Sequence, residues 1–196
     1  MKQDENVGAI LVVTPKEDAV RALRSALIRQ YGRIVSAGTV AEAKRVLARE
    51  PVAVLVILTP LGDETEIQTL FDMALRRLTS CIYVVGREIF HEAVYRQEGT
   101  EIYVCSYPLQ MEQMVQTVSL LHRLRRIRME DRREIERLNR KLEEEKSVSR
   151  LKCLLVGQKN MTEDEAHHYI EKYAMDHGLS RMRAAEQIER AMRPGS

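Results

Sequence analysis

Residues 52–60 read Val-Ala-Val-Leu-Val-Ile-Leu-Thr-Pro, an unbroken apolar run that ends at a proline. A short run of this kind, rich in β-branched residues, is typical of a strand that is buried on both faces of a sheet. A second such run, Ala9–Val13, also ends at a Thr-Pro pair. Three shorter strand-like runs follow the same pattern, at residues 33–37, 81–85 and 102–105.

Between these runs, apolar residues recur at helical spacing over 17–30, 41–50, 64–78 and 89–97. Strands that alternate with helices form βαβ units, in which helices cover both faces of a parallel sheet. Right-handed crossovers leave few topologies, and the flavodoxin-like order is a common one for five strands. The sequence therefore predicts an α/β domain with a five-stranded parallel sheet over residues 1–120.

The composition changes after Pro108. Residues 109–158 contain no proline and no glycine before Gly157, and they are rich in Glu, Arg, Lys and Leu, so they predict one long helix. Residues 121–147 indicate a coiled coil with polar interruptions, and we expect a homodimer there. The alternative is a single charged helix lying on its own domain. The expected seam has alternating spacings of three and four: Leu121, Leu124, Arg128, Asp131, Ile135, Leu138, Leu142 and Glu145.

The last part of the chain predicts three short amphipathic helices over residues 148–193. An apolar stripe that includes Leu151 precedes an expected break at 157–161. Thr162 and Glu165 have the spacing of a capping box. Gly178 is expected to end the second helix, and Ser180 to cap the third. Such a small core is marginal alone, so we expect it to depend on the long helix.

Three segments carry a more specific pattern: Ser149–Val156, Met161–Ala166 and Tyr173–Asp176. Their identities and spacing resemble the ANTAR domain, named after the AmiR and NasR transcription antitermination regulators. The departures are Leu151, Cys153 and Val156, where that family prefers alanine, glycine and often methionine. The resemblance implies that a dimer binds two small stem-loops in a nascent mRNA leader and blocks the terminator hairpin.

Five side chains are candidates for RNA contact: Lys152, Lys159, Tyr173, Arg181 and Arg183. Lys152 matches a lysine of the family pattern. Arg181 and Arg183 open the last helix, where they are either RNA contacts or solvated charges. Tyr173 follows Tyr169 by four residues on an apolar helix face, so its spacing favours a core position over a stacking surface for bases.

The first 120 residues resemble a receiver domain, whose chemistry needs an acidic pair after the first strand and an aspartate at the end of the third. Here the acidic pair is replaced by Thr14 and Pro15. The nucleophile position falls on Val56 or Ile57, and the lysine that receivers carry before the proline after the fifth strand is replaced by Tyr107, which precedes Pro108. The resemblance therefore implies a phosphorylation-incompetent domain that is regulated by a partner, such as a sensor protein.

Two other features of this domain follow from single residues. Pro108 is expected to follow a cis bond, as in receivers. Asp63, the carboxylate nearest to the lost nucleophile, is expected to be a turn or helix-cap residue.

Several function classes find no support in the sequence. No glycine-rich phosphate loop and no nucleophile–base pair is present, so we expect no enzyme and no cofactor. His167, His168 and His177 lack the spacing of a metal site. Three isolated cysteines are expected to be reduced thiols, with Cys81 and Cys105 buried.

The chain carries a formal net charge of only +2, with the basic excess after residue 120, which mildly favours a nucleic-acid partner. No apolar run approaches the length of about 20 residues that spans a bilayer, and Met1–Asn6 are polar, so we expect a cytoplasmic protein without membrane contact. Two other functions stay open: a DNA-binding response regulator with a helix-turn-helix, and a protein-interaction adaptor.

Overall fold

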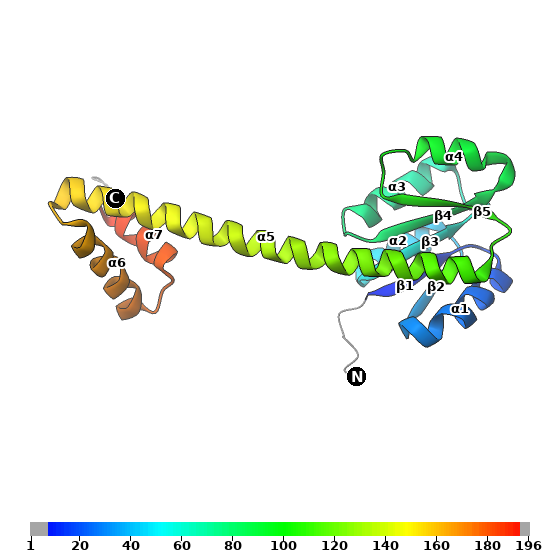
Figure 1. Cartoon of the computed structure of the whole chain (residues 1–196), viewed down its shortest axis with the longest axis horizontal. Coiled ribbons are helices and arrows are strands. Elements are labelled where there is room, and N and C mark those ends of the chain that lie inside the picture. Colours follow the sequence, from blue (N-terminus) through cyan, green and yellow to red (C-terminus); the bar gives the residue numbers. More distant parts are fainter. Residues whose placement is uncertain (1–7, 193–196) are drawn as a thin grey trace. The chain divides into compact units, whose positions relative to one another are not determined.

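The computed structural model describes residues 8–192, and Figure 1 shows its elements along the chain. Met1–Asn6 and Arg193, on which some expectations fell, lie outside the described residues. The chain divides after Met129 into two compact units, which we describe separately. Within residues 8–192, no helix is both long enough and apolar enough to cross a membrane.

The first unit contains a parallel sheet of five strands in the order β2-β1-β3-β4-β5, which confirms the predicted flavodoxin-like fold. Val13 pairs with Ala37 on one side and with Ile57 on the other, so β1 lies between β2 and β3. The strands are β1 (Ala9–Val13), β2 (Ile34–Ala37), β3 (Val52–Leu58), β4 (Ser80–Gly86) and β5 (Ile102–Tyr107).

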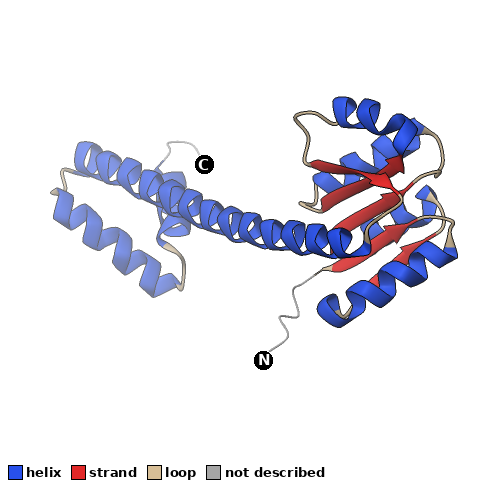
Figure 2. Ribbon diagram, turned by 45° about the vertical axis from the view of Figure 1, so that its right-hand side comes forward, coloured by secondary structure: helices blue, strands red, loops and turns tan. Residues whose placement is uncertain are grey.

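Helices cover both faces of this sheet (Figure 2). One face packs against α1 and the start of α5 through Leu23, Leu27 and Met114. The other face packs against α2 and α3 through Leu47 and Phe71. Every residue of β1 and β3 is buried, as the unbroken apolar runs predict. The helices are α1 (Glu17–Tyr31), α2 (Val40–Arg49), α3 (Glu64–Leu75), the short 3-10 turn η1 (Arg87–Ile89), α4 (Phe90–Arg96) and α5 (Met111–Lys159).

Local signals place most helix ends. The Asp63 side chain accepts a hydrogen bond from the Glu66 amide at 2.8 Å, so Asp63 is the predicted cap. The predicted helix ended at residue 78, whereas α3 ends at Leu75. Leu78 adopts a left-handed conformation (φ 57°), which a right-handed helix cannot include. The Tyr107–Pro108 bond is cis, as expected, and the Thr59–Pro60 bond is also cis.

The second unit packs the end of α5 against α6 (Glu163–His177) and α7 (Arg181–Met192). The Thr162 hydroxyl accepts from the Glu165 amide, and the Glu165 carboxylate accepts from the Thr162 amide, so the capping box is confirmed. Gly178 is left-handed after α6 (φ 61°), as predicted for a helix end. The core is small and consists of Val148, Leu151, Leu155, Ala166, Ile170, Ala185 and Ile188.

Two expectations about α5 are wrong in detail. The helix does not break at Gly157 but runs on to Lys159, and the chain turns at Asn160, whose φ is 52°. Glycine lowers helix stability without preventing helix formation, so the left-handed asparagine ends the helix instead. Leu121 and Arg128, placed on the coiled-coil seam, instead contact the first unit's own strands.

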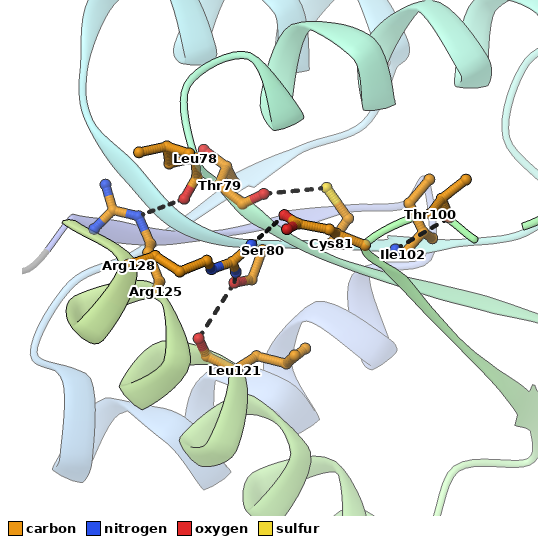
Figure 3. A network of polar contacts seen from close by, with 10 residues as sticks. Leu78, Thr79, Ser80, Cys81, Thr100, Ile102, Leu121, Arg125 and Arg128 are labelled. Carbon is orange, nitrogen blue, oxygen red and sulfur yellow. Dashed lines mark hydrogen bonds and ion pairs between the residues drawn. The ribbon is translucent and has the colours of Figure 1, made fainter. Parts of the chain in front are cut away.

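A polar network attaches this part of α5 to the amino-terminal end of β4 (Figure 3). The buried Arg125 donates from Nε to the Leu78 carbonyl at 3.0 Å. Arg128 donates to the Ser80 hydroxyl at 2.9 Å and also pairs with Glu101. The Ser80 hydroxyl in turn donates to the Leu121 carbonyl at 3.2 Å. Two arginines thereby fix the rotation of α5 about its axis within this unit.

Candidate nucleic-acid interface

The carboxyl edge of the sheet, where a receiver keeps its carboxylates, is lined here by other groups. Thr14 is buried, and its hydroxyl accepts from the Lys16 amide at 3.3 Å. Val56 and Ile57 are fully buried in β3. Tyr107 is about half exposed, and the Lys16 ammonium lies 5.4 Å from the centre of its ring. None of these side chains carries a carboxylate, the preferred oxygen ligand of Mg²⁺.

Pro15, the second residue in the place of the acidic pair, is exposed and has no functional group. Next to this edge lies an open cavity of about 600 Å³. Its lining includes apolar side chains such as Leu23 and Leu58, and also the charged residues Lys16, Glu17 and Asp18. Among residues 8–192, no group of three or more His, Cys, Asp or Glu side chains could hold a metal ion.

The cysteines differ in accessibility. Burial raises the pKa of the Cys81 thiol to about 12, with a smaller contribution from Glu101, and burial raises that of Cys105 to about 11. Cys105 is half-buried rather than buried, because β5 lies at the edge of the sheet. Cys153 is exposed on α5. The first two thiols are therefore poor nucleophiles at neutral pH.

The two candidate lysines at the end of α5 have different surroundings. Lys152 lies 3.5 Å from the Glu163 carboxylate, and its side chain is only 23% exposed. Lys159 is exposed in the last turn of the helix. Lys159 is thus freely available to a phosphate, whereas Lys152 must first exchange its partner Glu163.

The two candidate arginines lie at the start of α7. The Ser180 hydroxyl accepts from the Arg183 amide at 3.3 Å, so Ser180 is the predicted cap. Arg181 pairs with Glu144 of α5 at 3.1 Å. The Arg183 side chain is exposed, and no ion pair to it is found within the described part of the chain. Arg183 is consequently the arginine of this pair that is available to an anionic ligand.

Tyr173 combines a core position with an aromatic contact. Its ring packs against the small core, as its spacing favours, and its hydroxyl lies 3.3 Å from the Gln187 side-chain oxygen. The ring also stacks on His177, with 4.1 Å between ring centres and 19° between planes. His177 was not among the candidates for RNA contact that the sequence predicts. The Tyr-x-x-x-His spacing, which places both rings on one helix face, was the signal for this pair.

Among the other histidines, His167 lies 3.3 Å from the Glu171 carboxylate, and His168 is exposed on another face of α6. The three histidines are therefore not brought together in this unit.

One side of α5 in the second unit is apolar and uncovered. Ile135, Leu138 and Leu142 are 57%, 50% and 48% exposed. Their spacings of three and four place them on one helix face, and none of them belongs to the core of this unit. We call these three side chains the α5 stripe.

Comparison with solved structures supports the fold of the first unit. A response regulator receiver protein from Sinorhizobium medicae is 14% identical, with a TM-score of 0.54 over 61% of this chain and 98% of that chain. A receiver domain protein from Methanospirillum hungatei is 17% identical, with a TM-score of 0.53 over 63% and 99%. An adenylate cyclase structure from Rhodopirellula baltica is 13% identical, with a TM-score of 0.56 over 65% and 96%.

At these identities the likeness concerns the fold alone, and the N-terminal unit has the fold of a receiver domain. The C-terminal part is identified by sequence: residues 136–188 match the ANTAR domain family. The chain therefore joins a receiver-like α/β domain to a C-terminal ANTAR domain. A comparison with curated proteins finds no significant match.

Proposed function

We propose that this protein is an RNA-binding regulator of transcription antitermination that acts on hairpins in nascent mRNA leaders. The observation that carries the proposal is the ANTAR match over residues 136–188, on a unit with three packed helices. Sequence-specific RNA recognition targets the unstacked bases of loops, which bind to aromatic and hydrogen-bonding side chains. The candidates for contact are Lys152, Lys159, Tyr173, Arg181 and Arg183.

We propose that two chains pair along the α5 stripe. A single chain leaves about half of each stripe side chain in water, and pairing would remove this apolar surface from solvent. Glu145 continues the spacing of the stripe, so the seam would keep a polar interruption. A dimer presents two RNA-binding units, and two linked hairpins would then bind with an avidity that one hairpin lacks.

We propose further that the receiver-like domain responds to a partner protein and not to phosphorylation. Thr14, Val56 and Tyr107 supply neither the carboxylate nucleophile nor the carboxylate cation ligands that phosphoryl transfer in a receiver requires. The polar network of Arg125 and Arg128 gives a partner a physical route to α5, because a change at β4 or β5 would alter contacts that hold this helix.

The test is selection and binding of RNA by the full-length protein. A library of RNAs with two small hairpins and randomised loops is selected on the immobilised wild-type chain. The selected RNA, a version with one hairpin deleted and duplex DNA of the same sequence are then titrated over a salt series. We expect RNA-selective binding that weakens with salt and with loss of either hairpin. Preference for DNA would support a DNA-binding regulator, and binding of neither would support an adaptor.

A further inference from the structure

The stacked pair Tyr173–His177 is a fixed feature of α6. The Tyr173 hydroxyl lies 3.3 Å from Gln187 of α7, and the ring packs against the core. The His177 Nδ1 atom lies 2.9 Å from the Tyr173 carbonyl, to which its N–H tautomer donates. Both rings are therefore oriented before any ligand binds, which lowers the entropy lost on binding.

His177 is exposed although one face of its ring is covered. Among residues 8–192 no other ring stacks on His177, and its Nδ1 atom is occupied, so the opposite ring face and the Nε2 edge are left for a ligand. An imidazole with one covered and one open face is a platform on which a further planar ring can continue the stack. Planar rings of this kind are offered by unpaired nucleobases, which stack on His and Tyr side chains in RNA complexes.

The charges around the pair favour a base over a phosphate. His177 is the last residue of α6, where the unpaired carbonyl groups of the helix C-terminus give a partial negative charge. Asp176, its neighbour in the sequence, is an exposed carboxylate. Both features disfavour an anion directly at the ring. The cationic side chains begin four residues later, with Arg181 and the unpaired Arg183, so phosphates adjacent to a stacked base have partners there.

We infer that one unpaired nucleobase of an RNA loop stacks on the open face of His177, with Tyr173 as the ring behind it. This inference rests on the proposed RNA-binding function and adds the ligand class of one subsite. Tyr173 acts through His177 and is a positioning residue, while His177 is the residue in contact with the base.

The test is a double-mutant cycle on the full-length protein and the selected two-hairpin RNA. Each loop nucleotide is replaced in turn by an abasic one, and each RNA is titrated with the wild type and with His177→Ala. Loss of one base–aromatic stack is expected to weaken binding about tenfold. At the stacked position, the abasic RNA and His177→Ala should each cause this loss, and their combination should cause no further loss.

Two variants separate stacking from structure. His177→Phe keeps a planar ring and should restore most of the affinity, and His168→Ala, on another face of α6, should bind like the wild type. Equal binding by His177→Ala and wild type would overturn the inference, as would fully additive losses at every loop position. If the wild type binds no RNA at all, the proposed function and this inference both fail. If the wild type binds RNA and only the cycle fails, the proposed function stands without this subsite.

Discussion

The carboxyl edge of the sheet and the C-terminal helical unit differ in where they place reactive groups. At the sheet edge, the positions that matter for receiver chemistry hold Thr14, Val56 and Tyr107, and the first two are buried. In the C-terminal unit, Lys159, Arg183 and His177 are exposed. The C-terminal unit thus exposes cationic and aromatic side chains, whereas the sheet edge carries an uncharged side chain at each of these three positions.

The largest expected effect tests whether the sheet edge has become purely structural. Val56→Asp should lower the free energy of unfolding by about 4 kcal/mol, because it buries a carboxylate without a partner. Val56→Ala, which only removes methyl groups, should cost about half as much. Urea unfolding of both variants followed by circular dichroism measures the difference. A Val56→Asp variant as stable as Val56→Ala would show that the edge still accommodates a carboxylate.

The second prediction concerns the α5 stripe. Replacing Leu138 and Leu142 together by Gln should weaken self-association at least 100-fold, since both side chains would be removed from the paired apolar surface. Sedimentation equilibrium gives the dissociation constants. Arg133→Gln, on the opposite face of the same helix, is the matched control and should dimerise like the wild type. Unchanged association of the Leu138/Leu142 variant would exclude the stripe as the dimer interface.

The third prediction concerns the network at the start of β4. Ser80→Ala removes a buried hydroxyl that Arg128 and the Leu121 carbonyl both use, so it should cost about 2 kcal/mol of stability. The exposed pair of Arg132 and Glu136 offers a control, since Arg132→Ala should cost less than about 0.5 kcal/mol. If urea unfolding shows the same loss of stability for Ser80→Ala and Arg132→Ala, the network does not hold α5 in place.

The smallest effect concerns the cap of α6. Thr162→Ala should lower the free energy of unfolding of the C-terminal unit by about 1 kcal/mol, as measured by thermal unfolding. Hydrogen bonds from the Thr162 amide and side chain lower the pKa of the Glu165 carboxyl in the folded state. The stability that the ionised Glu165 carboxylate contributes is therefore present above the ordinary pKa of a glutamate, and it is lost as the pH falls through the lowered pKa. In Thr162→Ala this pH dependence of stability should be smaller. An equal loss of stability at acid pH in the variant and the wild type would contradict a capping role for Thr162.

The fold could be predicted from the sequence because its signals are local. The apolar runs at 9–13 and 52–58 match β1 and β3, and Asp63, Thr162 and Gly178 mark helix ends through their own side-chain or backbone chemistry. The candidate site was harder to predict, since exposure and pairing depend on contacts between distant residues. Glu163 covers Lys152, and β4 removes Arg128 from the seam. Spacing along one helix does not reveal which of its faces the rest of the unit occupies.

Read-through of a terminator during transcription tests the proposed antitermination function directly. A template encodes a two-hairpin leader, with loops from the selected RNA, followed by an intrinsic terminator that competes with the second hairpin. Full-length protein is added to a purified bacterial RNA polymerase, and the ratio of read-through to terminated transcript is measured. Wild-type protein is expected to raise read-through several-fold, and the Leu138/Leu142 variant is expected not to raise it. Unchanged termination at protein concentrations that saturate the RNA would contradict an antitermination function.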